Sequence, residues 1–338
     1  GDKMKKTVIA LVLAVLLRVP AVMALGTTTM DILKVPSGIK AQGMGGAYTA
    51  LADGPEAFDI NPAGLALTQN MDIMLVHNIY LQDVFFDSVY YSFALEGAGV
   101  LSIGGKFLSA GTVAETGENP DGTYSGETGQ ETYGMCYLGG LAYSINLGKL
   151  AYNDFTKNVN AGIAVKFSGE SIGPDYAEMG VSTDIGFIYT AVLEEEDFLS
   201  NRGQMLWNRA GFGIAFKNVG TSFGSGMTPL AFALGVYTQF INVGTSGNRV
   251  RVALDAEYNM ENGINAKAGI EYGHNIGDYN FSIRTGGNFN PEERLSSGFA
   301  AGAGFGMKLG DVRYSVDYVF LPYTELGSSH KVGLYIKL

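Results

Sequence analysis

From residue 70 to the C-terminus, apolar and polar residues alternate in one segment after another, and this period of two limits the fold more than any other feature. In 249–258, for example, Val252 and Leu254 share one face, while Arg251 and Asp255 share the other. Such alternation places successive side chains on opposite faces of a β-strand. Each segment reaches the roughly 9–11 residues with which a tilted strand crosses a membrane. We place about 14 strands, an even number as in bacterial barrels.

Composition decides which face of these strands meets water. Charged residues make only 16% of the chain, below the roughly 25% of soluble domains. In a soluble sandwich the apolar face would point into a core, whereas in a membrane barrel it points to lipid and the charged face lines the lumen. Aromatic residues near the expected strand ends suit an interfacial girdle; they are Tyr80, Phe85, Phe86, Tyr258, Tyr272, Phe320 and Tyr323. The fold class is therefore all-β, a single transmembrane antiparallel barrel.

The barrel hypothesis assigns individual positions to the two faces. Leu254 and Ile270 are expected to face lipid near the middle of the bilayer, where an arginine would be costly. Gly269 is expected on the lumenal face, where serine should cost much less. Two connections stand out as long: 111–131, expected as an extracellular loop, and 194–205, which contains the acidic run Glu194–Asp197. We expect that run to be a solvated stretch of charge rather than a calcium site.

The first residues have the character of an export signal. A basic start at Met4–Lys6 is followed by an apolar stretch, Val8–Leu17, which is too short to span a bilayer as a helix. Arg18 interrupts the pattern, and small residues near Ala24 suit cleavage. We therefore expect an extension and signal peptide at 1–24, a separate segment at 25–69 and the barrel at 70–338. The expected location is the cell outer membrane of a Gram-negative-type bacterium.

The segment at 25–69 does not follow the strand pattern. Its core, 37–67, is rich in glycine, which lets one backbone approach another closely and adopt positive φ. Asn61 can cap a helix whose first residue is Pro62. A phosphate-binding loop would need a preceding strand and a long following helix, and the sequence supplies neither around Gly43–Gly46. We therefore expect a compact hatch of short helical turns that plugs the barrel lumen.

Three parts of the chain resemble a known family. The run GMGGAYTALAD at 43–53, followed by NPAGLA at 61–66, resembles the hatch of the FadL-type outer-membrane transporter superfamily, and most closely its PorV/PorQ-like (UPF0164-like) branch. Residues 213–220 and 317–338 resemble its middle and closing hairpin. The last eight residues also resemble a barrel sorting signal, with Leu338 where phenylalanine is usual. The hatch residues implied by the resemblance are Gly43, Met44, Gly45, Gly46, Ala47, Asp53, Asn61, Pro62, Ala63 and Gly64.

The resemblance implies an uptake channel for hydrophobic small molecules, of which long-chain fatty acids are the best-known substrates. The alternative is a PorV-like component or partner of a protein secretion system. Expected partners are thus outer-membrane lipid, a hydrophobic ligand and, in the alternative, secretion-system proteins. The net charge of −11 argues against nucleic acid. Neither a cofactor nor a metal is expected, since the single cysteine, Cys136, excludes a cysteine-built cluster.

Two further groups of residues could serve transport. Cations expected on the lumenal face could meet an acidic head group, or could simply be paired with wall carboxylates; they are Arg249, Arg251, Lys267, Arg284 and Arg313. Paired glycines within strands could mark kinks, or could leave room for hatch side chains; they are Gly104, Gly105, Gly139 and Gly140. We do not expect an enzyme, because His77, His274 and His330 accompany no Gly-x-Ser-x-Gly elbow.

Overall fold

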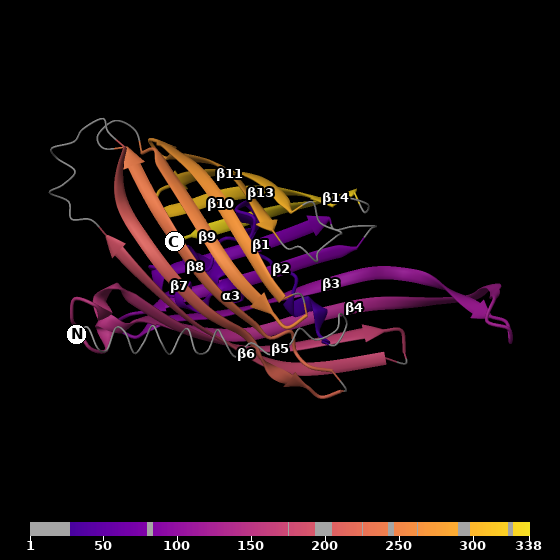
Figure 1. Ribbon diagram of the computed structural model, residues 1–338. Coiled ribbons are helices and arrows are strands. Elements are labelled where there is room, and N and C mark those ends of the chain that lie inside the picture. The colour runs from indigo at the N-terminus through magenta and orange to yellow at the C-terminus, as the bar shows by residue number, and fades with distance from the viewer. Residues whose placement is uncertain are drawn as a thin grey trace.

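Fourteen antiparallel strands form a closed barrel in the computed structural model (Figure 1). Consecutive strands pair, and β1 pairs with β14 to close the wall. The strand number and fold class predicted from the sequence are thus confirmed. The structure describes residues 28–79, 84–174, 176–192, 205–224, 226–242, 247–261, 263–289, 298–323 and 327–338. The expected signal peptide at 1–24 and the acidic run Glu194–Asp197 lie outside these residues.

The strand bounds are as follows: β1 Met71–Ile79, β2 Phe85–Leu95, β3 Gly99–Glu118, β4 Tyr124–Asn146, β5 Val159–Ile172, β6 Tyr176–Val192, β7 Met205–Ser222, β8 Ala231–Asn242, β9 Arg249–Asn259, β10 Gly263–Ile276, β11 Tyr279–Phe289, β12 Phe299–Leu309, β13 Val312–Tyr323 and β14 Gly327–Lys337.

The two faces of the wall follow the alternation of the sequence. Leu254 and Ile270 point outward and are exposed, whereas Asp255 and Glu271 are buried inside. An apolar exterior around a polar interior is the pattern of a membrane-spanning barrel. Phe86 departs from the expected girdle. It faces inward, is fully buried, and its ring lies 4.9 Å from the ammonium of Lys331, because it occupies the inward phase of β2.

The expectation of a long loop at 111–131 is wrong for most of that range. β3 and β4 continue past the neighbouring strands as a two-stranded ribbon, with register shifts between Ser109 and Thr112 and again further along. Only 119–123 remain as the turn. Figure 1 shows this hairpin projecting beyond the rest of the barrel. Its residues are mostly exposed on both faces, so apolar–polar alternation, the signal used to predict strands, is absent there.

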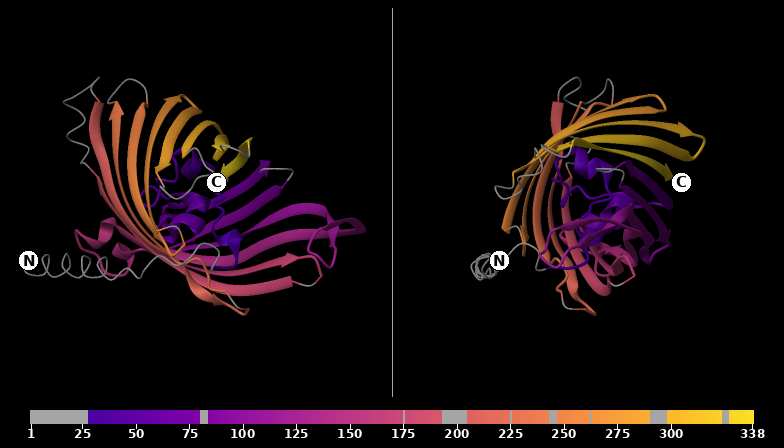
Figure 2. Two further views of the ribbon diagram at one scale, coloured as in Figure 1. Left: turned by 45° about the vertical axis from the view of Figure 1, so that its right-hand side comes forward. Right: turned by 90° about the vertical axis from the view of Figure 1, so that its right-hand side faces the viewer.

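Residues 28–70, here called the plug segment, lie inside the barrel (Figure 2). The segment consists of short helical turns: η1 Asp31–Leu33, α2 Ile39–Gly43, η2 Gly54–Glu56, α3 Ala57–Ile60 and η3 Pro62–Leu67. At the start of η3, the side-chain oxygen of Asn61 accepts a hydrogen bond from the amide of Ala63 at 3.2 Å, which is the cap expected from the sequence. Met44, Tyr48, Phe58 and Leu65 are almost completely buried and form a core with inward-facing wall residues. Among the described residues, no helix is both long and apolar enough to cross a membrane.

Candidate functional site

The plug backbone lies directly on glycines of the wall along β5 to β12. A Cβ added to Gly286 would lie 2.2 Å from the carbonyl carbon of Met44, and one added to Gly269 would lie 2.4 Å from its oxygen. A Cβ at Gly162 would lie 2.3 Å from the carbonyl carbon of Pro62. Glycine within a strand often marks such a close backbone approach. A Cβ at Gly213 would lie 2.5 Å from the carbonyl oxygen of Thr49, and one at Gly235 would lie 3.0 Å from the amide nitrogen of Ala50. Gly302 is in ordinary contact with Gly43, because a Cβ there would lie 3.4 Å from the Gly43 Cα. We call this set the glycine side.

Several plug positions require glycine, either for their backbone conformation or for lack of space. Gly45 and Gly46 have φ of 64° and 83°, a left-handed conformation that side chains disfavour. A Cβ at Gly45 would also lie 2.2 Å from the amide nitrogen of Gly287. Gly64 packs against the plug itself, where a Cβ would lie 2.1 Å from the carbonyl oxygen of Ala52. The remaining hatch residues predicted from the sequence are buried or half-buried in the same segment.

Two polar side chains fasten the plug on the glycine side. One carboxylate oxygen of Asp255, on β9, accepts hydrogen bonds from the amides of Tyr48 at 2.9 Å and Thr49 at 2.8 Å. The amide group of Asn61 donates to the carbonyl of Thr49 at 2.9 Å, and at 3.3 Å to each of two wall carbonyls, those of Phe187 and Ile214. Asn61 therefore caps a helix and also ties the plug to β6 and β7.

On the opposite arc, formed by β14, β1, β2 and β3, long side chains bridge from wall to plug. The ammonium of Lys331 donates to the carbonyl of Pro36 at 2.7 Å. Lys106 donates to the carbonyl of Val35 at 2.7 Å and pairs with Asp59 at 3.2 Å. We call this arc the side-chain side. Two tyrosines complete it: Tyr90 donates to Asp59 at 2.8 Å, and Tyr335 donates to Glu56.

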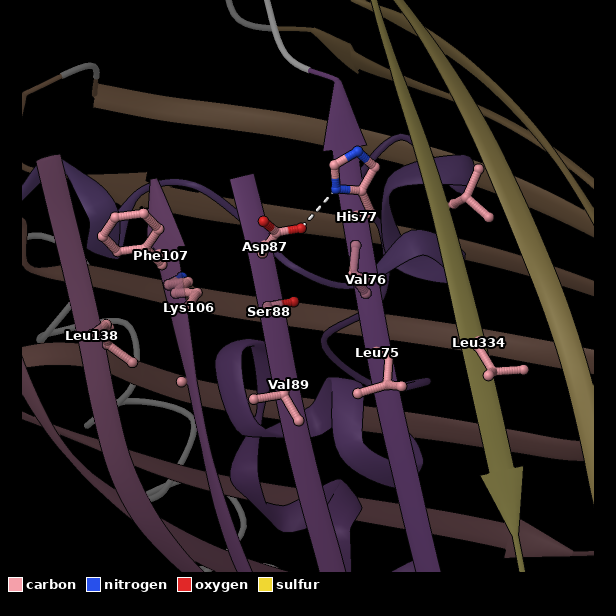
Figure 3. A pocket seen from close by; sticks show the side chains of 12 residues that line it. Leu75, Val76, His77, Asp87, Ser88, Val89, Lys106, Phe107, Leu138 and Leu334 are labelled. Carbon is pink, nitrogen blue, oxygen red and sulfur yellow. Dashed lines mark hydrogen bonds and ion pairs between the residues drawn. The ribbon is translucent and has the colours of Figure 1, made fainter. Parts of the chain in front are cut away.

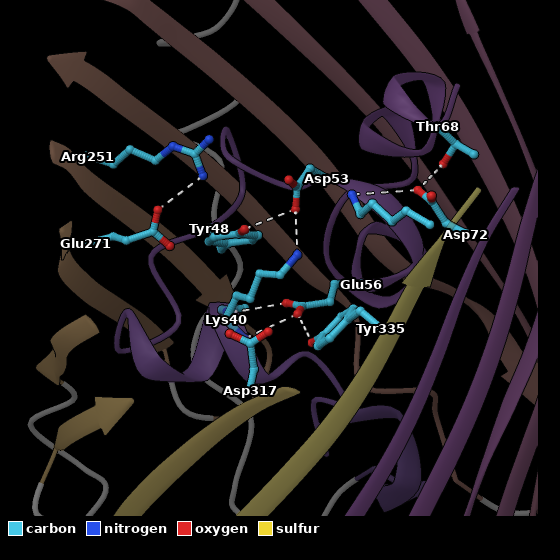
Figure 4. A network of polar contacts seen from close by, with 12 residues as sticks. Lys40, Tyr48, Asp53, Glu56, Thr68, Asp72, Arg251, Glu271, Asp317 and Tyr335 are labelled. Carbon is cyan, nitrogen blue, oxygen red and sulfur yellow. Dashed lines mark hydrogen bonds and ion pairs between the residues drawn. The ribbon is translucent and has the colours of Figure 1, made fainter. Parts of the chain in front are cut away.

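Behind these contacts, a buried polar network holds the plug together (Figure 4). The carboxylate of Glu56 accepts the amides of Lys40 and Ala41 at 3.2 Å each, and burial raises its pKa despite the nearby Lys40 ammonium. Burial also acts to raise the pKa of Asp53, but Lys40, 3.4 Å away, and more distant cations outweigh it and hold that pKa well below the usual range. Tyr48 donates to the same Asp53 oxygen at 3.1 Å. The plug is thus an ordered, internally bonded unit.

Most of the predicted lumenal cations are paired with wall carboxylates. Glu271 receives three of them, with Arg249 at 3.2 Å, Arg251 at 3.4 Å and Arg284 at 2.6 Å. Arg284 also contacts Asp317, and Lys267 pairs with Glu257 at 3.2 Å. Arg313 lies apart from them, exposed near the start of β13. These pairs match the alternative in which the lumenal charges satisfy one another.

Lys331 is not one of the lumenal cations expected from the sequence. It is 0% exposed, and within the described part of the chain it forms no ion pair; its contacts are the Pro36 carbonyl and the ring of Phe86. The alternation of β14 places it on the polar phase together with Gly333 and Tyr335, so the pattern could have identified it. What the pattern does not show is that it lacks a carboxylate partner.

The glycines considered as kinks face each other across β3 and β4. Gly104 pairs with Gly140 and Gly105 with Gly139, and the register is unbroken through both pairs. A Cβ at Gly104 would lie 2.1 Å from the ring of Tyr90, and one at Gly140 would lie 3.0 Å from the ring of Phe58. These two inward glycines make room for aromatic rings at the plug. Their neighbours Gly105 and Gly139 face outward.

A hollow of about 620 Å³ opens on the outer surface of the side-chain side (Figure 3). We call it the outer groove. Apolar side chains on β14, β1, β2 and β3 line it, among them Leu75, Val89 and Val332. His77 and Asp87, whose side chains are hydrogen-bonded at 2.7 Å, lie at one end of it. Lys106 is itself among the residues that line the groove, whereas Lys331 is not.

The other two histidines also lie on outward-facing strand positions. The ring of His330 is 2.7 Å from the hydroxyl of Tyr318 and 3.0 Å from that of Ser328. His274 contacts Asn248. Among the described residues, no group of three or more His, Cys, Asp or Glu side chains could hold a metal ion.

Solved structures similar to this barrel include a channel, a transporter and a FadL homologue. The CymD monoaromatic hydrocarbon channel has a TM-score of 0.48 and 11% identity, with 93% of this chain and 97% of that chain covered. The toluene transporter TbuX of Ralstonia pickettii has a TM-score of 0.48 and 11% identity, with coverage of 88% and 96%. A FadL homologue of Pseudomonas aeruginosa has a TM-score of 0.46 and 10% identity, with coverage of 89% and 97%.

Comparison by sequence gives a family. No curated protein matches the chain significantly. The model described as "Uncharacterised protein family (UPF0164)" matches residues 20–228 of the 338, which confirms the UPF0164-like resemblance. The chain belongs to this UPF0164 family.

Proposed function

We propose that this protein is an outer-membrane channel for the uptake of hydrophobic small molecules, and that the ligand passes sideways through the wall on the side-chain side. The observation that carries this proposal is the coincidence of two features. The plug occupies the lumen, and the outer groove lies on the arc where long side chains such as Lys106 and Lys331 bridge plug and wall. A hydrophobic ligand gains free energy by entering the bilayer instead of the aqueous periplasm, at about 25 cal/mol per Å² of apolar surface.

The two sides of the interface differ in how they could open. On the glycine side, backbone meets backbone, and nothing can pass unless the plug itself leaves. On the side-chain side, the gap is filled by flexible side chains such as Lys106 and Tyr90. Rotamer changes of such side chains are small motions compared with displacement of a packed segment. The path of least rearrangement therefore runs past them.

More specifically, we propose that the ligands are acidic, as long-chain fatty acids are. A buried ammonium without a carboxylate is costly, and an anionic head group would relieve that cost at Lys331. The cations expected from the sequence are less suited, because Arg249, Arg251, Arg284 and Lys267 already have carboxylate partners. We therefore assign the head-group role to Lys331.

The test is to fill the outer groove without touching the lumen. Val89→Trp places a large side chain in the groove from an outward position of β2, and Val236→Trp makes the same change on the outward face of β8. Both variants should reach the outer membrane. Uptake of a radiolabelled hydrophobic ligand should fall strongly in the first and remain near wild type in the second. Equal uptake by the two variants would contradict the lateral path. Wild-type protein without any uptake would make the secretion-partner alternative the better one.

A further inference from the structure

The loop 147–158 between β4 and β5 presents large apolar side chains at the rim where β1 starts and β14 ends. Tyr152 is 79% exposed, Leu150 70% and Phe155 64%. Figure 2 shows this end of the barrel opposite the projecting β3–β4 hairpin. Exposed apolar side chains grouped in this way mark a surface that meets another apolar phase or a partner.

The loop is ordered, so its exposed side chains are held in place. It contains two helical turns, η4 Leu147–Lys149 and η5 Thr156–Asn158. The side chain of Asn146 accepts the amide of Gly148 at 3.0 Å and donates to the carbonyl of Lys157 at 3.0 Å. The side chain of Asn153 accepts the amides of Phe155 and Thr156, both at 2.9 Å. These bonds satisfy the backbone of the loop while its apolar side chains point away from it.

The loop is continuous with the apolar exterior of the barrel. Phe155 stacks on Tyr189 of β6, with ring centroids 5.7 Å apart and planes at 19°. Tyr189 shares the outward phase of β6 with Phe187, which is exposed, whereas Ile188 between them is buried toward the plug. The apolar face that meets lipid thus extends onto Phe155. A protein partner at this place would compete with lipid for the same surface.

The charges of the loop fit a phospholipid headgroup layer. Lys149 and Lys157 are both exposed, and Lys157 also pairs with Asp154 at 3.0 Å. No lysine or arginine occurs from residue 107 to residue 148, so these two are the first cations after a long acidic stretch. Aromatic rings at the interface with nearby lysines are the usual means of anchoring at a membrane surface.

We propose that 147–158 is an interfacial foot, which inserts Leu150, Tyr152 and Phe155 into the headgroup region of the bilayer leaflet at this rim and places its lysines near lipid phosphates. The bilayer is favoured over a partner protein because the foot continues the lipid-facing surface through Tyr189. The foot holds the barrel in the membrane, whatever the channel transports.

The test uses tryptophan as a probe of depth. The chain has a single tryptophan, Trp207, so Trp207→Phe gives a silent background for Tyr152→Trp. The control is Tyr124→Trp, at a 68% exposed position in the projecting hairpin. In phosphatidylcholine vesicles, phospholipids brominated near the headgroup should quench the fluorescence at 152 strongly and that at 124 hardly at all. Aqueous acrylamide should show the reverse.

The foot would be overturned if position 152 were as accessible to acrylamide as position 124 and insensitive to brominated lipid. That outcome would indicate a surface left free in water for a partner protein. Leu150→Trp in the same background provides a second position, with the same two outcomes, should Tyr152→Trp fail to fold. Folding of each variant is checked by its shift in gel mobility on boiling.

Discussion

The plug contacts the barrel wall differently on its two sides. On the glycine side, wall and plug backbones touch, and positions such as Gly269 and Gly286 have no room for even one additional carbon. On the side-chain side, Lys331, Lys106 and Tyr90 reach the plug through hydrogen bonds of their side chains. The first arrangement is rigid because packed interiors do not deform readily. The second can rearrange by rotation of side chains. The comparison indicates that a plugged barrel can be fixed along one arc and remain adjustable along the other.

The largest expected effects on stability are those of substitutions at the wall glycines. Gly269→Ser and Gly286→Ser force a side chain into the Met44–Gly45 backbone, and we expect each to lower the free energy of unfolding by about 3 kcal/mol. This corrects the expectation that Gly269→Ser would be mild, since the cost is comparable to the roughly 2–4 kcal/mol of an arginine at the lipid-facing Leu254. Gly139→Ser is the control, because an added Cβ there has nothing within 4 Å. Urea unfolding in detergent measures all three. Similar values for Gly269→Ser and Gly139→Ser would remove the distinction between the sides.

A pH series separates titrating from non-titrating contacts. The pKa of Asp53 is held well below its usual value in the folded protein, so its stabilisation is present above its unfolded pKa of about 4 and is lost as the pH falls below it. We expect Asp53→Asn to cost about 1–2 kcal/mol at pH 7 and progressively less on acidification. The raised pKa of Glu56 acts in the opposite sense, since the cost of ionising it in the folded state appears as the pH rises above its unfolded value. The difference in unfolding free energy between Asp53→Asn and wild type, measured from pH 7 to pH 3, checks the sign. A difference that grows toward low pH would contradict it.

The smallest effect on stability is expected at Lys331. Lys331→Met removes a buried charge together with its bond to the Pro36 carbonyl, and these terms oppose each other, leaving a change within about 1 kcal/mol. Uptake of an acidic hydrophobic ligand should nevertheless fall, whereas uptake of a neutral ligand of the same length should be retained. Lys267→Met is the control, as it removes a cation that is paired with Glu257. Equal losses of uptake for acidic and neutral ligands would show that Lys331 does not bind the head group.

The sequence alone determined the features that follow from local pattern. The alternation gave the number of strands and the phase of Leu254 and Asp255, because the strand period of two depends only on backbone geometry. The Asn61–Pro62 cap was readable because its donor and acceptor lie two residues apart. Where both faces of a strand meet water, as in the β3–β4 ribbon, the pattern vanished and the prediction failed.

Only the tertiary structure decided which of these residues meet. Closure of β1 on β14 brings Lys331 beside Asn78 in register and over the plug, a contact between residues far apart in the chain. The register of β10 with β11 places Glu271 opposite Arg284, and Asp317 of β13 contacts the same guanidinium, so these lumenal charges are paired within the barrel wall. Phe86 faces inward because its phase on β2 is set by pairing with β1, whereas its position near a strand end had indicated lipid. Register and closure depend on contacts between distant segments, so the apolar–polar alternation within one strand does not predict them.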